Sequence, residues 1–496
     1  MTAITIPSFQ WWLSNDRNVG QEGAFWNSDG VEIRKNSQYV TLNRALQSVW
    51  TTGTNMPIAF SFDAGGGTNM AWELLAFTST GKVYDDSGEV TNAADSFANY
   101  AEANGKKYIL WGNKLYWFTP PWTISASLGT FFSANQTQRP WIDIDWDLII
   151  WDGNAVARYN KDTSFVVFNP VIEDQVIWWL IWTVYAITQI WPNVYVWCNN
   201  GNNTNLYIWD WQSSQPSELI TYPDKPVINV ALLWAQHYWW SQKAVTAIKN
   251  ILIGSGYEPT RYMTSDVPNN LSTGADNDNN RIGLYWTNTN AIETINDIVY
   301  LPWYGRIFGF GKYFPNQNVA LNREFTFTGS ECTAMLAWEL TPNLVDLSSQ
   351  LAIAYLNTST EWWRIPWNYY TGYYDFRDFN WLYTSEGFIE SMEYVAAWTT
   401  QWEEQRTFIV PFELTNAACT IEVSVQINRS GTWNSIKTIG STAYWIDYNT
   451  AELKDIGKWD VIQFRFDLAT SNTTYSPKLR VGMTNQSVTV GNLTRR

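Results

Sequence analysis

The stretch from Trp141 to Asn160, WIDIDWDLIIWDGNAVARYN, decides the fold, because it holds three short strand signals separated by turns. Apolar Ile142 and Ile144 alternate with Asp143 and Asp145. This alternation is typical of a β-strand with one buried face. The apolar run LII follows and is closed by WDG, a turn signal, before the next short strand. The stretch therefore predicts three successive short strands.

The same pattern returns three times downstream. In each copy an apolar strand signal leads through an Asp or Asn into a second strand signal: Val184–Ile187 to Val194–Trp197, Val245–Ile248 to Ile251–Gly254, and Ile292–Ile295 to Ile298–Leu301. The turn residues are Asp147, Asn193, Asn250 and Asp297, whose short side chains can hydrogen-bond the turn backbone. Their spacings of 46, 57 and 47 residues indicate an internal repeat.

Weaker copies extend this repeat to seven units across roughly three hundred residues. They begin at Leu74 (LLAFTSTGKVYDDSG), Lys106 (KKYILWGNKLYWF) and Leu351 (LAIAYLNTSTEWWRI). A repeat of about 40–50 residues made only of short strands predicts propeller blades, whereas a β-solenoid needs a shorter repeat. The sequence therefore predicts an all-β protein with a seven-bladed β-propeller.

Composition and charge exclude some classes of function. The 496 residues are 45% hydrophobic and only 16% charged, with a formal net charge of −15. This charge argues against a broad phosphate-binding face, so no nucleic-acid partner is expected. Cys198, Cys332 and Cys419 are too few and too scattered for a disulfide framework or a zinc site. The N-terminal MTAITIPSFQ shows no signal for secretion.

The 33 tryptophans are unusual in number and in position. Trp151 and Trp197 occupy the slot that Gly254 fills in the third copy, and further Trp pairs stand in what look like turns: Trp11-Trp12, Trp209-Asp210-Trp211, Trp239-Trp240 and Trp362-Trp363. A turn residue with positive φ favours glycine over a bulky aromatic. We therefore interpret many of these Trp as UGA codons that the source organism reads as glycine. The alternative is a protein that is genuinely rich in Trp.

Residues 1–70 are expected to form a lead-in that closes onto the propeller. With glycine at the Trp positions, Phe9 to Asn36 becomes FQGGLSNDRNVGQEGAFGNSDGVEIRKN. This segment resembles the opening of propeller-bearing virion proteins of tailed phages, in which a Gly-Gly segment precedes a polar stretch and a short DIR-K strand. The resemblance covers about forty residues. It implies a structural protein of a phage particle, from a lineage that reads UGA as glycine.

The propeller is expected to span residues 71–384, and residues 385–496 to form a C-terminal β-sandwich. The latter segment has longer alternating strands, FIESMEYV, RTFIVPFEL, CTIEVSVQI and VIQFRFDL. It resembles the C-terminal sandwich of phage tail and minor structural proteins, in which a VSVxINxSGTW strand pair precedes IQFRxxL and a Ser-Pro-Lys-Leu end. Here that end is Ser476 to Leu479.

Candidate catalytic residues are sparse. His237 is the lone histidine, and it has no second histidine or cysteine near it in the sequence. Asp143, Asp145 and Asp147 could supply the paired carboxylates of a propeller glycosidase, but the other units lack equivalents. We interpret these aspartates as strand and turn residues and expect no catalytic site.

No cofactor or metal site is expected either. Asp276, Asp278 and Asn280 have the alternate spacing of a calcium loop but lack its downstream glutamate. The glycine-rich DAGGGTN at 63–69 lacks the lysine of a phosphate-binding loop. The apolar segment Val176 to Trp191 is sixteen residues long, short of the ~20 that a membrane-spanning helix needs.

The only candidate binding residues are the tyrosines of WNYYTGYYDF, which could stack on sugar rings: Tyr369, Tyr370, Tyr373 and Tyr374. From these features and the resemblance we expect a non-catalytic structural or attachment protein located in a phage virion. Its partners would be other virion proteins, copies of itself in a homo-oligomer, and a host surface glycan or protein. The alternatives are a propeller-type carbohydrate-active enzyme and a bacterial surface adhesin.

Overall fold

The computed structural model of the chain is built from β-strands, with no helix among the residues it describes. The described residues are 4–6, 25–33, 39–43, 45, 47–51, 57–63, 73–78, 80–85, 88–92, 97–103, 106–111, 114–119, 123–125, 127–130, 141–144, 147–152, 155–159, 184–200, 203–210, 216–223, 227–233, 236–241, 244–248, 259–264, 293–295, 298–303, 306–311, 320–326, 331–338, 350–356, 361–366, 382–395, 407–414, 416–440, 447–452, 461–480 and 488–491. The protein is therefore all-β, as the sequence predicts.

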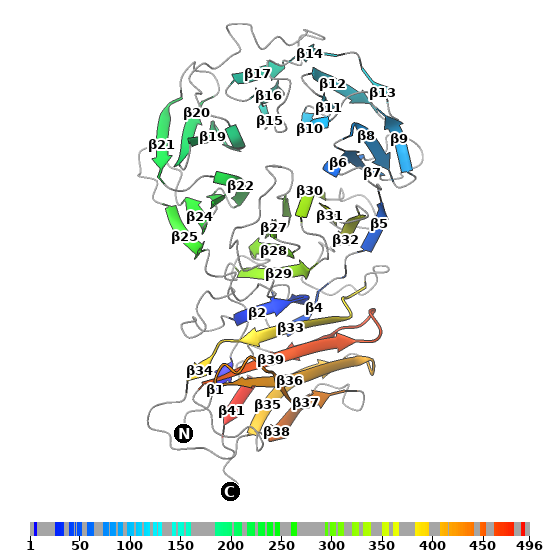
Figure 1. Cartoon of the computed structure of the whole chain (residues 1–496), viewed down its shortest axis with the longest axis vertical. Helices are drawn as coiled ribbons and strands as arrows, with labels where there is room; N and C mark the ends of the chain where they lie inside the picture. The colour runs from blue at the N-terminus through cyan, green and yellow to red at the C-terminus, as the bar shows by residue number, and fades with distance from the viewer. Residues whose placement is uncertain are drawn as a thin grey trace.

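Seven antiparallel sheets of the described chain lie around a common centre, in a propeller-like arrangement that we call the ring (Figure 1). The first three sheets contain β6 (Pro57–Asp63), β7 (Glu73–Thr78), β8 (Lys82–Asp85) and β9 (Gly88–Asn92); β10 (Phe97–Ala103), β11 (Lys106–Trp111), β12 (Lys114–Thr119), β13 (Thr123–Ile124) and β14 (Gly129–Thr130); and β15 (Trp141–Ile144), β16 (Asp147–Asp152) and β17 (Ala155–Tyr159).

The remaining four sheets of the ring have four strands each. They contain β18 (Val184–Ile190), β19 (Asn193–Asn200), β20 (Asn203–Trp209) and β21 (Glu218–Tyr222); β22 (Val227–Leu233), β23 (Gln236–Ser241), β24 (Ala244–Ile248) and β25 (Pro259–Thr264); β26 (Glu293–Ile295), β27 (Ile298–Trp303), β28 (Arg306–Gly311) and β29 (Ala320–Thr326); and β30 (Glu331–Trp338), β31 (Gln350–Leu356), β32 (Glu361–Pro366) and β5 (Gln47–Thr51).

Each of the seven repeat units falls in a different sheet of the ring, but the units do not all match the same pair of strands. The three weaker copies match the second and third strands of their sheets, as in β11 with β12. In the first, second and fourth copies the predicted strand pair joins the first two strands of a sheet, as in β15 with β16. In the third copy Val245–Ile248 lies in β24, which pairs with β23 and β25. The predicted partner Ile251–Gly254 lies outside the described residues. In this sheet the first two strands are β22 and β23. Strand β23 begins at Gln236, where the other copies have Asp or Asn.

The apolar run of the opening stretch is buried on both faces of its sheet. Successive strand residues point to opposite faces, so Leu148 and Ile150 pack with Tyr108 of the preceding sheet. Ile149 and Trp151 pack instead with strands β19 and β20 of the following sheet. Because a ring sheet has a neighbour on each side, the strand is apolar throughout rather than alternating.

The tryptophans of these strands do not lie in turns, contrary to expectation. Trp151 and Trp197 lie within β16 and β19 and are among the largest fully buried side chains. The pairs at 239–240 and 362–363 lie within β23 and β32. In the described chain positive φ angles occur outside glycine only at Asn428 and Arg429. The turn-based reason for glycine therefore does not apply at these positions, and aromatic residues suit strands. The codon interpretation stays a prediction.

Below the ring in Figure 1 lie two further sheets, which we call the base. The first contains β1 (Ile4–Ile6), β41 (Val488–Gly491), β35 (Thr407–Leu414), β40 (Pro477–Arg480), β4 (Tyr39–Leu42), β3 (Val31–Glu32) and β38 (Asp447–Glu452). The second contains β2 (Phe25–Asp29), β33 (Glu386–Ser391), β39 (Val461–Thr470), β36 (Cys419–Ile427), β37 (Asn434–Ile439) and β34 (Tyr394–Val395).

The base uses strands from both ends of the chain, so the ring is an insertion between β4 and β33. Strands β1, β2, β3 and β4 all pair within the base sheets. Strand β5 then pairs with β32, and β6 pairs with β7 in the ring. The sheets thus place the first division between β4 and β5 rather than at residue 70, whereas β33 begins at Glu386, next to the predicted boundary at residue 385. Pairing between strands that are distant in sequence decides how the chain divides into ring and base. The residue pattern of one segment does not reveal this pairing.

Candidate functional site

The structure places few of the residues singled out from the sequence. Tyr369, Tyr370, Tyr373 and Tyr374 lie outside the described residues, as do Asp145, Asp276, Asp278 and Asn280. The backbone of His237 lies in β23, opposite Leu232 and Ile248. Asp147 is buried at the start of β16, and Asp143 is half-buried in β15. Asp143 faces Leu148 and Asp147 faces Ile144, so these two aspartates lie on opposite faces of the sheet and do not form a pair.

Asp143 lies near the hydroxyl of Tyr108. Burial, followed by the nearby Tyr159 and Asp143, raises the pKa of Tyr108 to about 12. The Tyr108 and Tyr159 rings meet edge to face with centroids 5.7 Å apart. Tyr108 thus stays protonated and packs as a core residue between two ring sheets. No described group of three or more His, Cys, Asp or Glu side chains is placed to hold a metal ion.

A buried hydroxyl–ammonium cluster joins two neighbouring ring sheets. Ser61 of β6 and Tyr100 of β10 lie with their hydroxyl oxygens 2.6 Å apart. Lys107 of β11 donates from Nζ to Ser61 Oγ at 2.8 Å and to the Tyr100 hydroxyl at 3.5 Å. A serine beside a lysine can act as a nucleophile, but Ser61 is only 1% exposed. The cluster therefore joins the two sheets and presents no open reaction centre.

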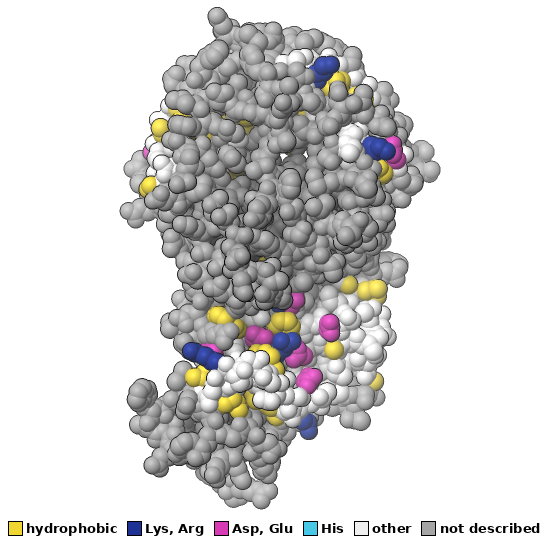
Figure 2. Space-filling view, in the orientation of Figure 1, with side chains coloured by type: hydrophobic (Ala, Val, Ile, Leu, Met, Phe, Trp, Pro, Cys, Tyr) yellow, Lys and Arg dark blue, Asp and Glu magenta, His cyan; other side chains and the backbone are white. Residues whose placement is uncertain are grey.

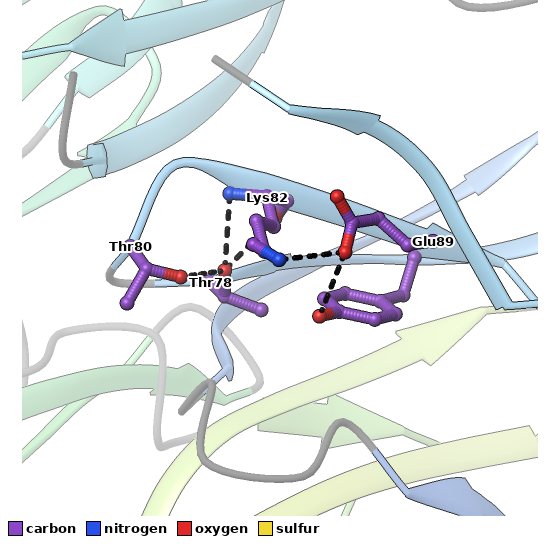
Figure 3. A network of polar contacts seen from close by, with 5 residues as sticks. Thr78, Thr80, Lys82 and Glu89 are labelled. Atoms are coloured by element: carbon purple, nitrogen blue, oxygen red, sulfur yellow. Dashed lines mark hydrogen bonds and ion pairs between the residues drawn. The ribbon is translucent and has the colours of Figure 1, made fainter. Parts of the chain in front are cut away.

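An outer hairpin of the ring carries a second polar network (Figure 3). The Thr78 hydroxyl donates to the Lys82 carbonyl oxygen at 3.0 Å and accepts from the Lys82 N–H at 3.1 Å. Lys82 Nζ lies 2.7 Å from Glu89 Oε2, and this contact raises the pKa of Lys82. The pair is partly exposed, so it contributes little to stability. These contacts fix the hairpin that connects β7 and β8.

The contact between ring and base contains buried hydrogen bonds. Ser28 of β2 donates from Oγ to Asn322 Oδ1 of β29 at 2.6 Å. Asn322 Nδ2 in turn donates to the Val31 carbonyl oxygen at 2.7 Å. Ser28 and Asn322 are both fully buried. Satisfied buried hydrogen bonds of this kind fix one geometry, because breaking them leaves polar groups without water.

Charged and aromatic side chains continue this contact. Arg323 of β29 is buried, and its Nε lies 3.3 Å from Asp29 Oδ1 of β2. The Arg323 guanidinium lies 5.6 Å from the ring centre of Phe388, and that of Arg465 lies 3.8 Å from the same ring. We call Ser28, Asp29, Asn322, Arg323, Phe388 and Arg465 the joint. It holds one ring sheet against the second sheet of the base.

Carboxylates balance the joint's second arginine. Arg465 lies 2.7 Å from Asp467 Oδ1 and 3.3 Å from Glu390 Oε1. Figure 2 shows acidic and basic side chains gathered over this part of the base, next to the ring. Each arginine of the joint has several directional partners, both carboxylates and an aromatic ring. These contacts therefore oppose movement of the ring relative to the base.

A strained hairpin lies farther along the same sheet. Asn428 and Arg429 have φ of 49° and 56°, which costs a residue other than glycine about 1–2 kcal/mol. Arg429 donates to the buried carboxylate of Glu393 from Nε, at 3.2 Å to Oε1 and 3.0 Å to Oε2, and from Nη2, at 2.8 Å to Oε2. Asn428 Oδ1 accepts from the Val461 N–H at 3.0 Å. These contacts hold the turn in its left-handed conformation and keep an exposed hairpin rigid.

The two chain crossings between ring and base are also tied to each other. The N–H of Ala45, just before β5, donates to the Leu382 carbonyl oxygen at 2.8 Å. The Thr384 N–H donates to the Asn43 carbonyl oxygen at 2.9 Å. Together with the joint, these bonds make the ring–base contact the best-defined candidate functional region. It sets how the ring is presented relative to the base.

Sequence reasoning does not find the joint. Ser28 and Asn322 stand 294 residues apart, and neither belongs to a recognisable motif. The one available signal is Asp29-Gly30, a turn dipeptide before the short strand VEI.

No helix in the described residues is long and apolar enough to cross a membrane. The carboxyl half of the candidate membrane segment, from Val184, lies in β18.

The chain matches no family model and no curated protein. Among solved structures, it is similar to the CNH domain of AfRom2, with TM-score 0.40 and 7% identity over 66% of this chain and 100% of that one. The Neurospora crassa Pan2 WD40 domain gives TM-score 0.38 and 8% identity over 65% and 96%. Kuenenia stuttgartiensis hydrazine synthase gives 0.43 and 11% over 63% and 95%. These similarities concern the strand arrangement and carry no functional argument.

Proposed function

We propose that the ring is a seven-bladed β-propeller closed by β5, and that the base is a β-sandwich. Two observations support the closed ring: each repeat unit lies in its own sheet, and β5 precedes the ring in sequence yet pairs with β32, its last strand. One blade then contains strands from both ends of the ring segment, and this pairing closes the ring. The sandwich is supported by alternate burial along the first half of β36, where Cys419, Ile421 and Val423 are fully buried and Thr420 and Glu422 are not.

Proline at both Gln47 and Ser48, which pair with Arg364 and Trp363, is expected to open the ring. Successive N–H groups of a strand point to opposite sides, so one of the two prolines removes a β5–β32 hydrogen bond. We expect a loss of about 1–3 kcal/mol in the free energy of unfolding of the ring, because the partner group on β32 is left without its hydrogen bond. Denaturant unfolding measures it. Proline at Asn36 and Ser37, upstream of the paired β4, is the control; equal stability of both variants would contradict closure by β5.

We further propose that this protein is a non-catalytic structural or attachment component of a phage virion. The observation that carries the proposal is the joint, which fixes the ring on the base through buried Ser28–Asn322 and Asp29–Arg323 contacts. A rigid subunit of this kind can anchor through its base to other virion proteins while the ring faces a host glycan or protein. Repetition of the subunit in a homo-oligomer would turn weak contacts into tight attachment.

The experiment that tests this role is mass spectrometry of purified phage particles from the source. We expect peptides of this chain in the particle. Its copy number should be a multiple of the number of subunits in one symmetric homo-oligomer. Absence from the particle would contradict the virion role. Glycan hydrolysis by the purified protein, lost in Asp147→Asn, would contradict the non-catalytic role and favour the carbohydrate-active alternative.

The same spectra test the codon interpretation. We expect peptides covering position 151 to carry glycine, with UGA at that codon, while Trp433 and Trp459 are encoded by UGG. This expectation rests on the repeat, in which Trp151 occupies the slot that Gly254 fills in the third copy. Tryptophan at position 151 in particle-derived peptides would contradict the interpretation without touching the virion role.

A further inference from the structure

Strand β1 is held in the base by one short strand pairing. It is three residues long and lies at the edge of the first base sheet, where it pairs with β41. The facing pairs are Ile4 with Val490, Thr5 with Thr489, and Ile6 with Val488. Each such pair contributes roughly 0.2–1 kcal/mol, so the whole contact is weak enough to open and re-form.

The connection that follows β1 is long, unlike the one that follows β4. Eighteen residues separate Ile6 from Phe25. A chain of that length can span up to about 60 Å, more than the width of a small domain. The four residues between Leu42 and Gln47 are tied by the Ala45–Leu382 hydrogen bond, so β5 cannot leave its own ring.

Both chain ends lie at the end of the base that points away from the ring (Figure 1). A contact made there by a second subunit leaves the ring unobstructed. Strand β41 lies between β1 and β35, so it becomes the edge of the sheet when β1 leaves. Its backbone groups are then satisfied equally well by β1 of any copy, because the exchanged strand makes the same contacts.

We propose that β1 of one copy pairs with β41 of a neighbouring copy when subunits assemble, so that strand exchange links the bases. The partner is a second copy of this chain. The inference rests on the proposed multivalent role in requiring copies side by side. Exchange adds few contacts, but it makes each subunit bind two neighbours, which strengthens the assembly through effective concentration.

Two single-cysteine variants test the exchange. Thr5→Cys is placed on one chain and Thr489→Cys on another, and the two chains are co-expressed and mildly oxidised in the assembled state. Directly facing residues of antiparallel strands lie within disulfide range. We expect a covalent pair of the two different chains, with the disulfide located by peptide mapping between the two introduced cysteines. Each variant oxidised alone gives the background.

The matched control uses Thr41→Cys and Lys478→Cys, which face each other between β4 and β40. Because β4 is tied to β5, chains that carry one control cysteine each should give no covalent pair, whereas a chain with both should close internally. A third chain carries both Thr5→Cys and Thr489→Cys. If this chain closes internally, while chains that carry one of the two cysteines each form no covalent pair, exchange is overturned. If the chain that carries both Thr5→Cys and Thr489→Cys forms no disulfide between these positions, either within one chain or between chains, the β1–β41 pairing itself is overturned. Neither outcome changes whether peptides of the chain occur in particles, so the virion role is judged separately.

Discussion

Replacing Gly387 by alanine is expected to lower the free energy of unfolding of the base by about 3 kcal/mol. A Cβ at this position would lie 2.5 Å from the Gly30 carbonyl oxygen and 2.9 Å from the Asp29 carbonyl oxygen. Both neighbours are backbone atoms, which cannot turn aside as a flexible side chain can. Strands β2 and β33 would have to separate at the point where the joint begins.

The effect should reach the ring–base contact as well as the base. Asp29 is the residue whose carboxylate meets Arg323, and Phe388 follows Gly387 directly. Separation of β2 from β33 therefore moves the two residues that hold the Arg323 guanidinium. We expect Gly387→Ala to increase proteolytic cleavage between ring and base as well as to lower the denaturant midpoint.

Gly440→Ala is the matched control. Its Cβ would meet Thr420 Cγ2 at 3.6 Å, an ordinary van der Waals distance, in the same sheet of the base. We expect a change within about 0.5 kcal/mol. Denaturant unfolding of both variants, followed by limited proteolysis, makes the comparison. Equal midpoints for Gly387→Ala, Gly440→Ala and the parent protein would show that the close approach of β2 and β33 is not required.

The predictable part of the fold is the part governed by local pattern. Ile142 and Ile144 mark β15 by alternation, and the run Leu148 to Ile150 marks β16 by its continuous burial between two sheets. Alternation along CTIEVSVQI likewise predicts β36. The prediction for the third repeat copy is wrong because Asn250 has the residue type of the turn position. In the structure the second strand of this sheet begins at Gln236 instead. A short polar residue after a strand is a turn signal, not a statement of which strands pair.

The candidate functional region could not be predicted in the same way. The joint combines residues near 28 and 322 with Phe388 and Arg465, and nothing local relates them. Its geometry depends on strands from both chain ends meeting in one base, and a single sequence does not encode that pairing as a pattern. The tail Ser476 to Leu479 illustrates this: its strand character is readable, but its partner is not. The Leu42 N–H donates to Ser476 Oγ at 2.8 Å across 434 residues.

Deleting residues 1–46 is expected to abolish folding of the base while the ring, which keeps β5, retains its sheets. The deletion removes β1, β2, β3 and β4 from both base sheets. Five side chains that are at most 1% exposed are lost from the core: Phe25, Val31, Ile33, Val40 and Leu42. At about 1.5–3 kcal/mol each, their burial contributes roughly 7–15 kcal/mol, as much as the whole stability of a typical domain.

Limited proteolysis with mass spectrometry measures this outcome. In the shortened chain we expect cleavage throughout residues 385–496 and a protected fragment that begins near residue 47 and ends before residue 385. Deletion of residues 1–24 is the control, because it removes β1 but keeps the paired strands β2, β3 and β4, so the base should stay protected. Equal protection of residues 385–496 in the two shortened chains would mean that the C-terminal segment folds without the N-terminal strands. The base would then be an independent domain rather than one completed by both ends of the chain, and the joint would have no fixed partner in β2.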